Sequence, residues 1–410
     1  MSKDNKEQDM DNSFDSLFAT ASQFEGKLAK IKCIGVGGGG GNAINRMVDA
    51  GIDNVEFIAV NTDAQDLGRN KAHRLVQVGE TLTKGLGVGG KPELGRAAAE
   101  ESIEQLKLMI ADTDLLFITA GMGGGTGTGV APIIAKIAKE TYGDNILVVG
   151  VVTRPFNFEG YRRADIADKG IKEIQKYADS MLIVPNEKLF DNIDSRTTRE
   201  EAFKMVDDVL LQAVRGIAQV IIRPGEMNID YNDLKAIMLH SGRSLIGTGA
   251  AKGQGRHLEA AKQALNSPLL ENADITGAKG FLVCFSAPDD ITMPEIGEVM
   301  NIIRQYSSNE SSVKFGHIRD TSLPEGTFCV TIIVTGFAME GAPHLTSRMS
   351  LSSPVRGFQD NNMRANSQRK PLPISPQRVV SRTPRPADIF DSRSDFMLIP
   401  ACIRRRKEGK

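Results

Sequence analysis

The stretch that decides the fold is Gly121-Met122-Gly123-Gly124-Gly125-Thr126-Gly127-Thr128-Gly129. It follows the apolar run 115–120 and precedes the apolar-periodic run 130–139, which predicts a strand, a glycine loop and a helix. Glycines let backbone N–H groups approach a ligand closely, and a helix N-terminus carries roughly half a positive charge. The stretch therefore predicts a phosphate-binding loop. A flexible linker is the alternative, but a linker is not expected between a buried strand and a helix.

Two further glycine loops indicate a nucleoside triphosphate rather than a dinucleotide. The first, residues 35–42, places Gly35, Gly37 and Gly40 at the offsets of a dinucleotide fingerprint, and the other is residues 85–92. Taken alone, the first loop favours an NAD-dependent oxidoreductase. A dinucleotide fold needs one pyrophosphate loop, however, whereas three loops suit a triphosphate held from several sides. The five histidines are scattered and form no hydride-transfer site.

Several longer motifs carry a family resemblance. Residues 123–129 resemble the tubulin signature, and residues 60–65, 153–156, 158–160 and 228–233 are similar to motifs of the FtsZ family, the bacterial tubulin homologues of cell division. The similarity runs from about Ala29 to Phe337 and resumes in the last sixteen residues. It implies a GTPase that polymerises head-to-tail into filaments of the cytokinetic ring and recruits other division proteins.

The resemblance implies that GTP or GDP is held by four loops, with Mg²⁺ bound mainly through the phosphates. The implied phosphate-binding residues are Gly37, Gly38, Gly39, Gly40 and Asn42; Asn61 and Asp63; Gly87, Gly89 and Gly90; and Gly123, Gly124, Gly125, Thr126, Gly127 and Thr128. The third loop departs from the family, because Val88, Gly90 and Lys91 replace the commoner Ala, Ala and Asn. The turnover rate therefore does not follow from the sequence. For Asp63, an N-cap is the alternative role.

Recognition of the base and sugar is expected from later residues. Guanine presents N–H donors, which a carboxylate complements. The resemblance implies that Asp207 accepts these guanine N–H donors, with Asn186 beside it and Phe203 stacked on the guanine ring. It places Thr153, Pro155, Glu159 and Arg163 around the ribose and phosphates. Core packing is the alternative for Phe203, because this residue lies on the apolar stripe of its helix.

The expected catalytic residues are Asn228, Asp230 and Asp233. A simpler reading makes Asp230 the N-cap of the next helix, with Asp233 favouring its positive end. The preceding helical pattern, residues 201–222, covers about 30 Å. This loop therefore cannot reach the nucleotide of its own chain. In the family it completes the site of the next subunit, a heterologous contact that forms filaments.

The predicted fold class is α/β. A doubly wound, parallel-sheet, tubulin-like nucleotide domain is joined by a long central helix to a smaller α/β domain, with a disordered C-terminal linker. The predicted divisions are a disordered arm (1–28), a GTP-binding domain (29–200), the central helix (201–223), a GTPase-activating domain (224–338), a disordered linker (339–392) and a partner-binding peptide (393–410). His240-Ser241-Gly242-Arg243 has no role that the sequence explains.

Composition indicates a cytoplasmic protein without membrane insertion or nucleic-acid binding. Hydrophobic residues make up 40% and charged residues 25%, and no apolar run approaches a bilayer-spanning length. The cysteines at 33, 284, 329 and 402 have no metal-ligand spacing, and the first three are expected to be buried. Residues 341–410 are basic, with 14 Lys/Arg against five Asp/Glu. Their end, 395–406, resembles the peptide that binds membrane-tethering division adaptors, although Leu398 and Cys402 replace an acid and an aromatic. A stray basic tail is the alternative.

Overall fold

The computed structural model describes residues 29–190, 196–222, 229–267, 275, 278–288, 290–320 and 323–336. The predicted N-terminal arm, linker and C-terminal peptide lie outside the described residues, as does Asn228. No helix in the described ranges combines the length and the apolar character needed to cross a bilayer.

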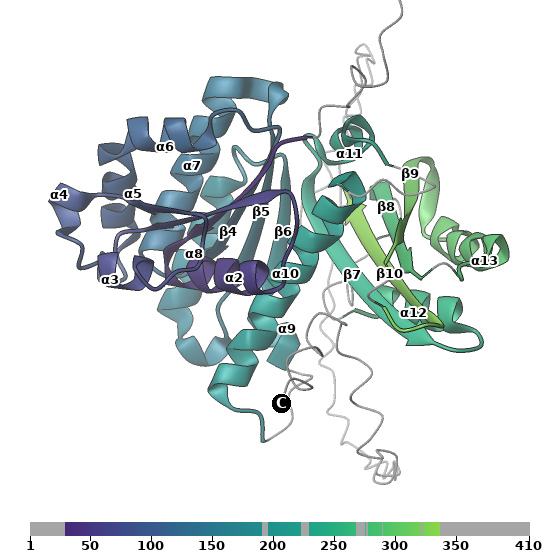
Figure 1. The fold of residues 1–410 in the computed structure, drawn as a ribbon. Coiled ribbons are helices and arrows are strands. Elements are labelled where there is room, and N and C mark those ends of the chain that lie inside the picture. Colours follow the sequence, from purple (N-terminus) through teal and green to yellow (C-terminus); the bar gives the residue numbers. More distant parts are fainter. Residues whose placement is uncertain are drawn as a thin grey trace, which may run out of the picture. The chain divides into compact units, whose positions relative to one another are not determined.

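One mostly parallel sheet carries ten strands (Figure 1). The strands are β1 (Ile31–Val36), β2 (Val55–Asn61), β3 (Arg74–Gln77), β4 (Leu115–Gly121), β5 (Leu147–Arg154), β6 (Ser180–Pro185), β7 (Gly242–Lys252), β8 (Ala278–Ala287), β9 (Ser307–Arg319) and β10 (Thr327–Thr335). Their order in the sheet is β3-β2-β1-β4-β5-β6-β7-β10-β8-β9. The strands from β3 to β7 run parallel, and β10 pairs antiparallel with both β7 and β8. The strand order reverses beside β1, which is where ligands of doubly wound sheets bind.

Helices cover both faces of the sheet. They are α2 (Gly37–Asp49), α3 (Ala64–Leu67), α4 (Glu80–Thr83), α5 (Pro92–Glu101), α6 (Ile103–Ile110), α7 (Thr126–Tyr142), α8 (Tyr161–Ile174), α9 (Asn186–Phe190), α10 (Arg199–Ile222), α11 (Tyr231–Met238), α12 (Arg256–Leu265) and α13 (Met293–Arg304). Two short 3₁₀ helices are η2 (Gly143–Asn145) and η3 (Asn157–Glu159). The sequence patterns predict strands at 30–35, 55–60, 74–78, 115–120, 146–152, 181–185, 279–285, 313–318 and 328–336, and a strand is present at each. Most ends agree within two residues, but β9 begins at Ser307, six residues before its predicted start.

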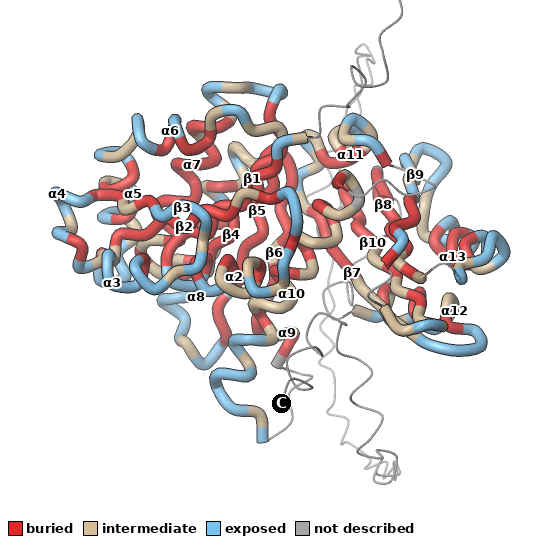
Figure 2. Tube along the Cα trace, viewed as in Figure 1, coloured by how far each residue is buried: buried red, intermediate tan, exposed pale blue. Residues whose placement is uncertain are grey.

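Side chains of β1 alternate between two hydrophobic cores. Ile31 and Cys33 pack with α2 and α10, whereas Ile34 and Val36 pack with α6, α7 and α8. Burial on both faces explains why these strands read as continuous apolar runs. In Figure 2 the central strands, such as β4 and β5, are accordingly buried, whereas exposed residues lie on outer helices and loops and on the outermost strands β3 and β9.

The long helix α10 packs against strands from both halves of the sheet, β1 to β6 and β7 to β10. Its buried stripe, including Leu210, Val214 and Ile217, belongs to a core that also contains Leu282 of β8 and Ile333 of β10. A third core, formed with α12 and α13, covers the other face of β8 and β10. With 24 residues, α10 is about 36 Å long.

Strand β7 was not predicted from the sequence. It contains three glycines, Gly242, Gly247 and Gly249, and shows no regular alternation of apolar and polar residues. Its pairing with β6 covers only Ser180–Leu182, whereas its pairing with β10 covers nine residues. Long-range pairing therefore forms this strand, and the sheet runs on without a break from β6 to β10.

Candidate functional site

The first glycine loop places a helix N-terminus at the end of β1. Helix α2 begins at Gly37, has no side-chain cap and has no acidic residue in its first turn. Gly37 has a φ of +69°, and a Cβ there would lie 2.9 Å from the Gly127 backbone nitrogen. A Cβ at Gly40 would lie 2.4 Å from the Thr119 carbonyl oxygen. Only glycine permits these contacts. The first brings the N-termini of α2 and α7 together, and the second packs α2 closely against β4. Gly38, Gly39 and Asn42 are exposed.

The signature loop is shaped by its own threonine. Thr128 is buried, and its hydroxyl oxygen accepts a hydrogen bond from the Gly123 backbone nitrogen at 2.9 Å. The hydroxyl of Thr126 lies 2.7 Å from that of Thr62, on the loop after β2. Helix α7 starts at Thr126, again without a side-chain cap or a first-turn acid. Two uncapped helix N-termini at one place favour an anion.

The second and third loops are hydrogen-bonded to each other. Gly87 donates its backbone N–H to the Thr62 carbonyl at 3.3 Å, and Ala64 donates to the Gly85 carbonyl at 3.0 Å. Asp63 caps α3 by accepting from the Gln65 and Asp66 nitrogens at 2.9 and 3.1 Å. The N-cap alternative for Asp63 is therefore confirmed as one of its roles.

The four loops enclose a hollow of about 480 Å³. Its lining contains the predicted residues Gly38, Asn61, Asp63, Gly87, Gly89, Gly90, Gly125 and Thr126. A cavity of this size lies in the range of small-molecule sites. Gln65, Asp66, Arg69 and Leu86 also line it and were not predicted as site residues. Asp66 could have been identified from the sequence, because it lies three residues after Asp63, the expected N-cap. In the structure its carboxylate accepts a hydrogen bond from the Asn61 side-chain nitrogen at 2.7 Å.

The predicted base-binding residues lie at the start of α9 and on α10. Asn186 is 4% exposed, and its buried Oδ1 has no hydrogen-bond partner among the described residues. Phe203 is 39% exposed, so it is not a fully packed core residue, and its ring lies 5.5 Å from that of Phe156 in an edge-to-face arrangement. Helices α9 and α10 contact each other. The buried, unpaired amide oxygen of one and the exposed ring of the other are suited to a flat polar ligand.

The two neighbouring acids of α10 have different surroundings. Asp208 forms an ion pair with Arg46 of α2. Burial raises the pKa of Asp207 to about 7, although Arg46 opposes the rise. Asp207 is thus a carboxyl group whose ionic form lacks solvation in the free protein and would be stabilised by N–H donors of a ligand.

The predicted ribose residues lie after β5. Thr153 and Pro155 are buried, and the Thr153 carbonyl accepts from the Met122 nitrogen at the start of the signature loop. The carboxylate of Glu159 accepts from the Phe156 nitrogen and pairs with Arg163, with 2.9 Å for each contact. A Cβ at Gly123 would lie 2.7 Å from the Arg163 carbonyl oxygen, so this segment borders the signature loop.

The predicted catalytic acids lie near the amino ends of the strands, away from the glycine loops. Asp230 caps α11, and its carboxylate accepts from the Asp233 nitrogen at 2.6 Å. Between them, the Tyr231 hydroxyl donates to the carbonyl of Asp114 at 2.7 Å. Asp114 precedes β4, whereas the signature loop follows it, and β4 spans about 23 Å. The acids and the four-loop hollow are therefore at opposite ends of the strands.

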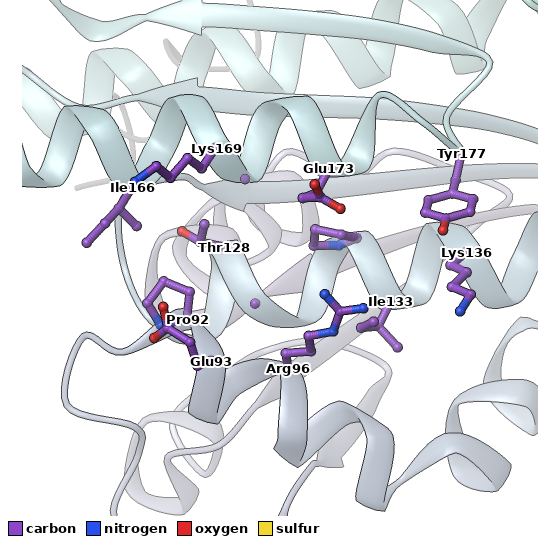
Figure 3. A pocket seen from close by; sticks show the side chains of 13 residues that line it. Pro92, Glu93, Arg96, Thr128, Ile133, Lys136, Ile166, Lys169, Glu173 and Tyr177 are labelled. Atoms are coloured by element: carbon purple, nitrogen blue, oxygen red, sulfur yellow. The ribbon is translucent and has the colours of Figure 1, made fainter.

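A second hollow lies between α5, α7 and α8 (Figure 3). It measures about 240 Å³, and its lining includes Pro132, Ile133, Ile166 and Tyr177. Of the predicted nucleotide-binding residues, only Thr128 lines it. This apolar hollow is distinct from the four-loop site.

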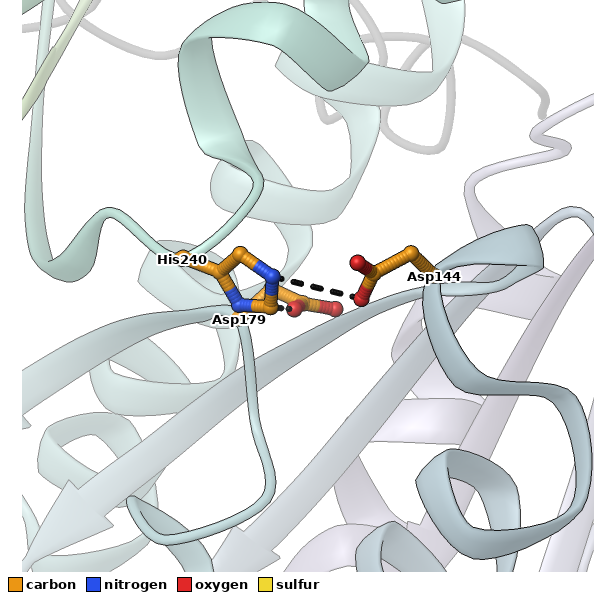
Figure 4. A group of neighbouring side chains, drawn as sticks. All are labelled: Asp144, Asp179 and His240. Carbon is orange, nitrogen blue, oxygen red and sulfur yellow. Dashed lines mark ion pairs between the residues drawn. The ribbon is translucent and has the colours of Figure 1, made fainter.

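The residues without a predicted role, 240–243, lead from α11 into β7. His240 lies 3.2 Å from a carboxylate oxygen of Asp144 and 3.3 Å from one of Asp179 (Figure 4). Three such side chains resemble a metal-binding set, but the Lys139 ammonium lies 3.0 Å from each of the two carboxylates. Lys139, followed by His240, holds the pKa of Asp144 below its usual value. The cluster is therefore an ion-pair network beside the first residues of β7.

Comparisons with known proteins match two separate parts of the chain. Residues 30–194 match the GTPase domain of the Tubulin/FtsZ family, and residues 242–338 match the C-terminal domain of the FtsZ family. The chain is 41% identical to "Cell division protein FtsZ" of Coxiella burnetii (strain RSA 493 / Nine Mile phase I), over 93% of this chain and 97% of that protein.

Two solved structures are similar to this one. "FtsZ dimer, empty" from M. jannaschii has a TM-score of 0.72 and 36% identity, covering 84% of this chain and all of that one. The GTPgS-bound protofilament of CetZ2 from Haloferax volcanii has a TM-score of 0.64 and 22% identity, covering 74% of this chain and 92% of that one. The second likeness shows the fold alone.

Proposed function

Because this chain belongs to the FtsZ family, we propose that its four-loop hollow binds GTP and that the loop bearing Asp230 and Asp233 completes the hydrolysis site of the next subunit. The protein is a cell-division GTPase that polymerises into filaments. The matched families give no support to the oxidoreductase alternative. The proposal concerns which residues perform the reaction and where they meet.

One observation carries the shared site: the Tyr231–Asp114 hydrogen bond. It holds the proposed catalytic loop at the amino end of β4, while the phosphate loops lie at the carboxyl ends of the strands. An acid at one end of a subunit can contact a nucleotide at the other end only across a head-to-tail contact. Such a contact is heterologous and repeats without closing, as a filament requires.

The phosphates are assigned to the helix N-termini and glycine loops. Backbone N–H groups of α2 and α7 would bind the anionic oxygens, and the proposed residues are those that the sequence predicts on the four loops. Carboxylates of Asp63 and Asp66 at the hollow fit a hard cation such as Mg²⁺, held mainly through the phosphates. Bound Mg²⁺ would neutralise charge on the phosphate oxygens. Asp230 and Asp233, with Asn228, are proposed to orient the attacking water.

The base pocket is assigned to Asn186, Phe203 and Asp207. The carboxylate of Asp207 would accept the guanine N1–H and N2–H donors, and the unpaired Asn186 Oδ1 supports a polar ligand here. Thr153, Pro155, Glu159 and Arg163 are proposed to border the ribose and phosphates.

GTP affinity should depend on pH, because Asp207 must be ionised to accept two N–H donors. Burial raises its pKa to about 7 in the free protein, so below that pH binding must first release a proton. We expect affinity to fall about tenfold from pH 8 to pH 6 and to be flat above pH 8. Equilibrium binding of a fluorescent GTP analogue, below the assembly threshold, measures this. A flat profile in that range would contradict the role of Asp207.

The shared site is tested by measuring GTP hydrolysis per subunit across protein concentrations, with light scattering alongside. We expect both signals to rise together above a threshold, because a lone subunit lacks the acids at its nucleotide. Hydrolysis that is constant per subunit and occurs without scattering would leave a monomeric GTPase and remove the role given to Asp230 and Asp233.

The remaining assignments are also proposals. We place the GTP-binding part at 29–200, the connecting helix at 201–223 and the GTPase-activating part at 224–338. The peptide at 393–410 is proposed to bind membrane-tethering adaptors of the division ring, in the cytoplasm at mid-cell. Its apolar stretch, 396–403, followed by three arginines, is the feature that supports a partner.

A further inference from the structure

Lys314 lies beside the two proposed catalytic acids. It is on β9, opposite Leu282 of β8, and α11 packs against β8. Its ammonium nitrogen lies 2.6 Å from a carboxylate oxygen of Asp233. The pair is open to solvent, with 42% of the Lys314 side chain and 33% of the Asp233 side chain exposed. Lys314 is therefore on the surface that would meet the next subunit.

The lysine and the two acids form one charged cluster. Asp230 accepts from the backbone nitrogen of Asp233, whose side chain contacts Lys314. The carboxylate of Asp233, and at longer range that of Asp230, raises the pKa of Lys314, which keeps the ammonium protonated. Asp233 is thus held at its backbone by one acid and at its carboxylate by a cation.

The Lys314 ammonium reduces an electrostatic repulsion that the shared site would otherwise create. Head-to-tail assembly brings two carboxylates toward a highly charged triphosphate, and like charges disfavour such a contact. An ammonium on the same surface offsets one carboxylate within the Debye length of about 8 Å at physiological salt. It also fixes the direction of the Asp233 carboxylate, and misplacing a catalytic group is costly.

We propose that Lys314 is a positioning residue of the GTP hydrolysis site, which orients Asp233 and lowers the repulsion between the catalytic loop and the neighbouring subunit's triphosphate. The proposal rests on the shared site described above. A structural role alone does not account for the pair, because exposed ion pairs contribute little to stability. Lys314→Met is therefore expected to fold with a nearly unchanged Tm.

The test compares Lys314→Met with Lys314→Arg and with the control Lys252→Met, which removes an exposed lysine at the end of β7. Well above the assembly threshold, K314M should hydrolyse GTP roughly tenfold to hundredfold more slowly per subunit. Lys314→Arg should restore most of the rate, and the control should behave as the wild type. GTP binding to single subunits should not change, because each subunit's own nucleotide lies at the far end of the sheet.

A second measurement, the assembly threshold, separates the loss of the Lys314 charge from a structural effect of the substitution. The assembly threshold of K314M should rise, and it should fall again when NaCl is added or when Asp233→Asn is combined with it. The double variant should assemble but remain inactive, because it also lacks the acid. A K314M protein with the wild-type rate and threshold would overturn the proposal, as would a raised threshold that neither salt nor Asp233→Asn lowers.

Failure of this proposal is distinguishable from failure of the shared site. If Asp230→Asn hydrolyses GTP as the wild type does, the shared site is wrong whatever Lys314 does. If Asp230→Asn is inactive while K314M is normal, only the role of Lys314 is lost.

Discussion

Asp207→Asn should change the nucleotide preference of the protein from GTP to XTP. Guanine offers N–H donors at positions 1 and 2, and a carboxylate accepts both. Xanthine keeps the donor at position 1 but has a carbonyl oxygen at position 2. The asparagine amide can accept the first and donate to the second, whereas with guanine its NH₂ group would face another donor.

The expected effect is large because the pocket is partly buried. Losing one charge-assisted hydrogen bond and leaving facing donors unsatisfied costs on the order of 3 kcal/mol, or roughly a hundredfold in GTP affinity. The pH dependence of binding should also disappear, since the group that titrates near pH 7 is gone. Competition of GTP and XTP for a fluorescent analogue measures the preference.

Asp208→Asn is the matched control. It removes the same charge from the neighbouring position, but this carboxylate pairs with Arg46 rather than lying in the proposed pocket. We expect some loss of stability and an unchanged preference for GTP. If both variants shifted the preference equally, net charge on α10 rather than recognition by Asp207 would be responsible.

Asp230→Asn should bind GTP and assemble but hydrolyse it roughly a hundredfold or more slowly. Loss of a positioned acid or base typically costs between about 10²-fold and 10⁴-fold. Asparagine is chosen because it caps helices about as well as aspartate, so α11 should keep its N-terminus. Asp230→Ala would lose both the cap and the carboxylate, and its effect on assembly would be harder to interpret. Phosphate release and light scattering measure the two steps separately.

Mixing variants tests whether the acid acts across subunits. Asp230→Asn subunits bind GTP but lack the acid, while Asp207→Asn subunits bind XTP and keep it. With GTP and XTP both present, filaments of the mixture should hydrolyse labelled GTP faster than Asp230→Asn filaments alone. No gain in the mixture, despite joint assembly, would mean that Asp230 does not act on a neighbouring nucleotide.

Local sequence determined most of the fold. The strands before the first and last glycine loops, β1 and β4, are largely apolar because helices bury both faces. Helix α10 shows its apolar stripe at helical spacing. The glycine loops were recognisable because only glycine permits the backbone contacts seen at Gly37 and Gly40. The family resemblance then predicted which polar residues accompany them.

Tertiary structure determined the features that depend on contacts between residues far apart in the chain. Strand β7 has weak local preference and exists through its pairing with β10. Adjacent acids on α10 differ because Arg46, 162 residues from Asp208, pairs with only one of them. Lys314 meets Asp233 only through the packing of α11 on the strands beside β9. Propensity and hydrophobic period act over a few residues and are readable in sequence, whereas charge pairing and burial depend on which distant segments the fold brings together.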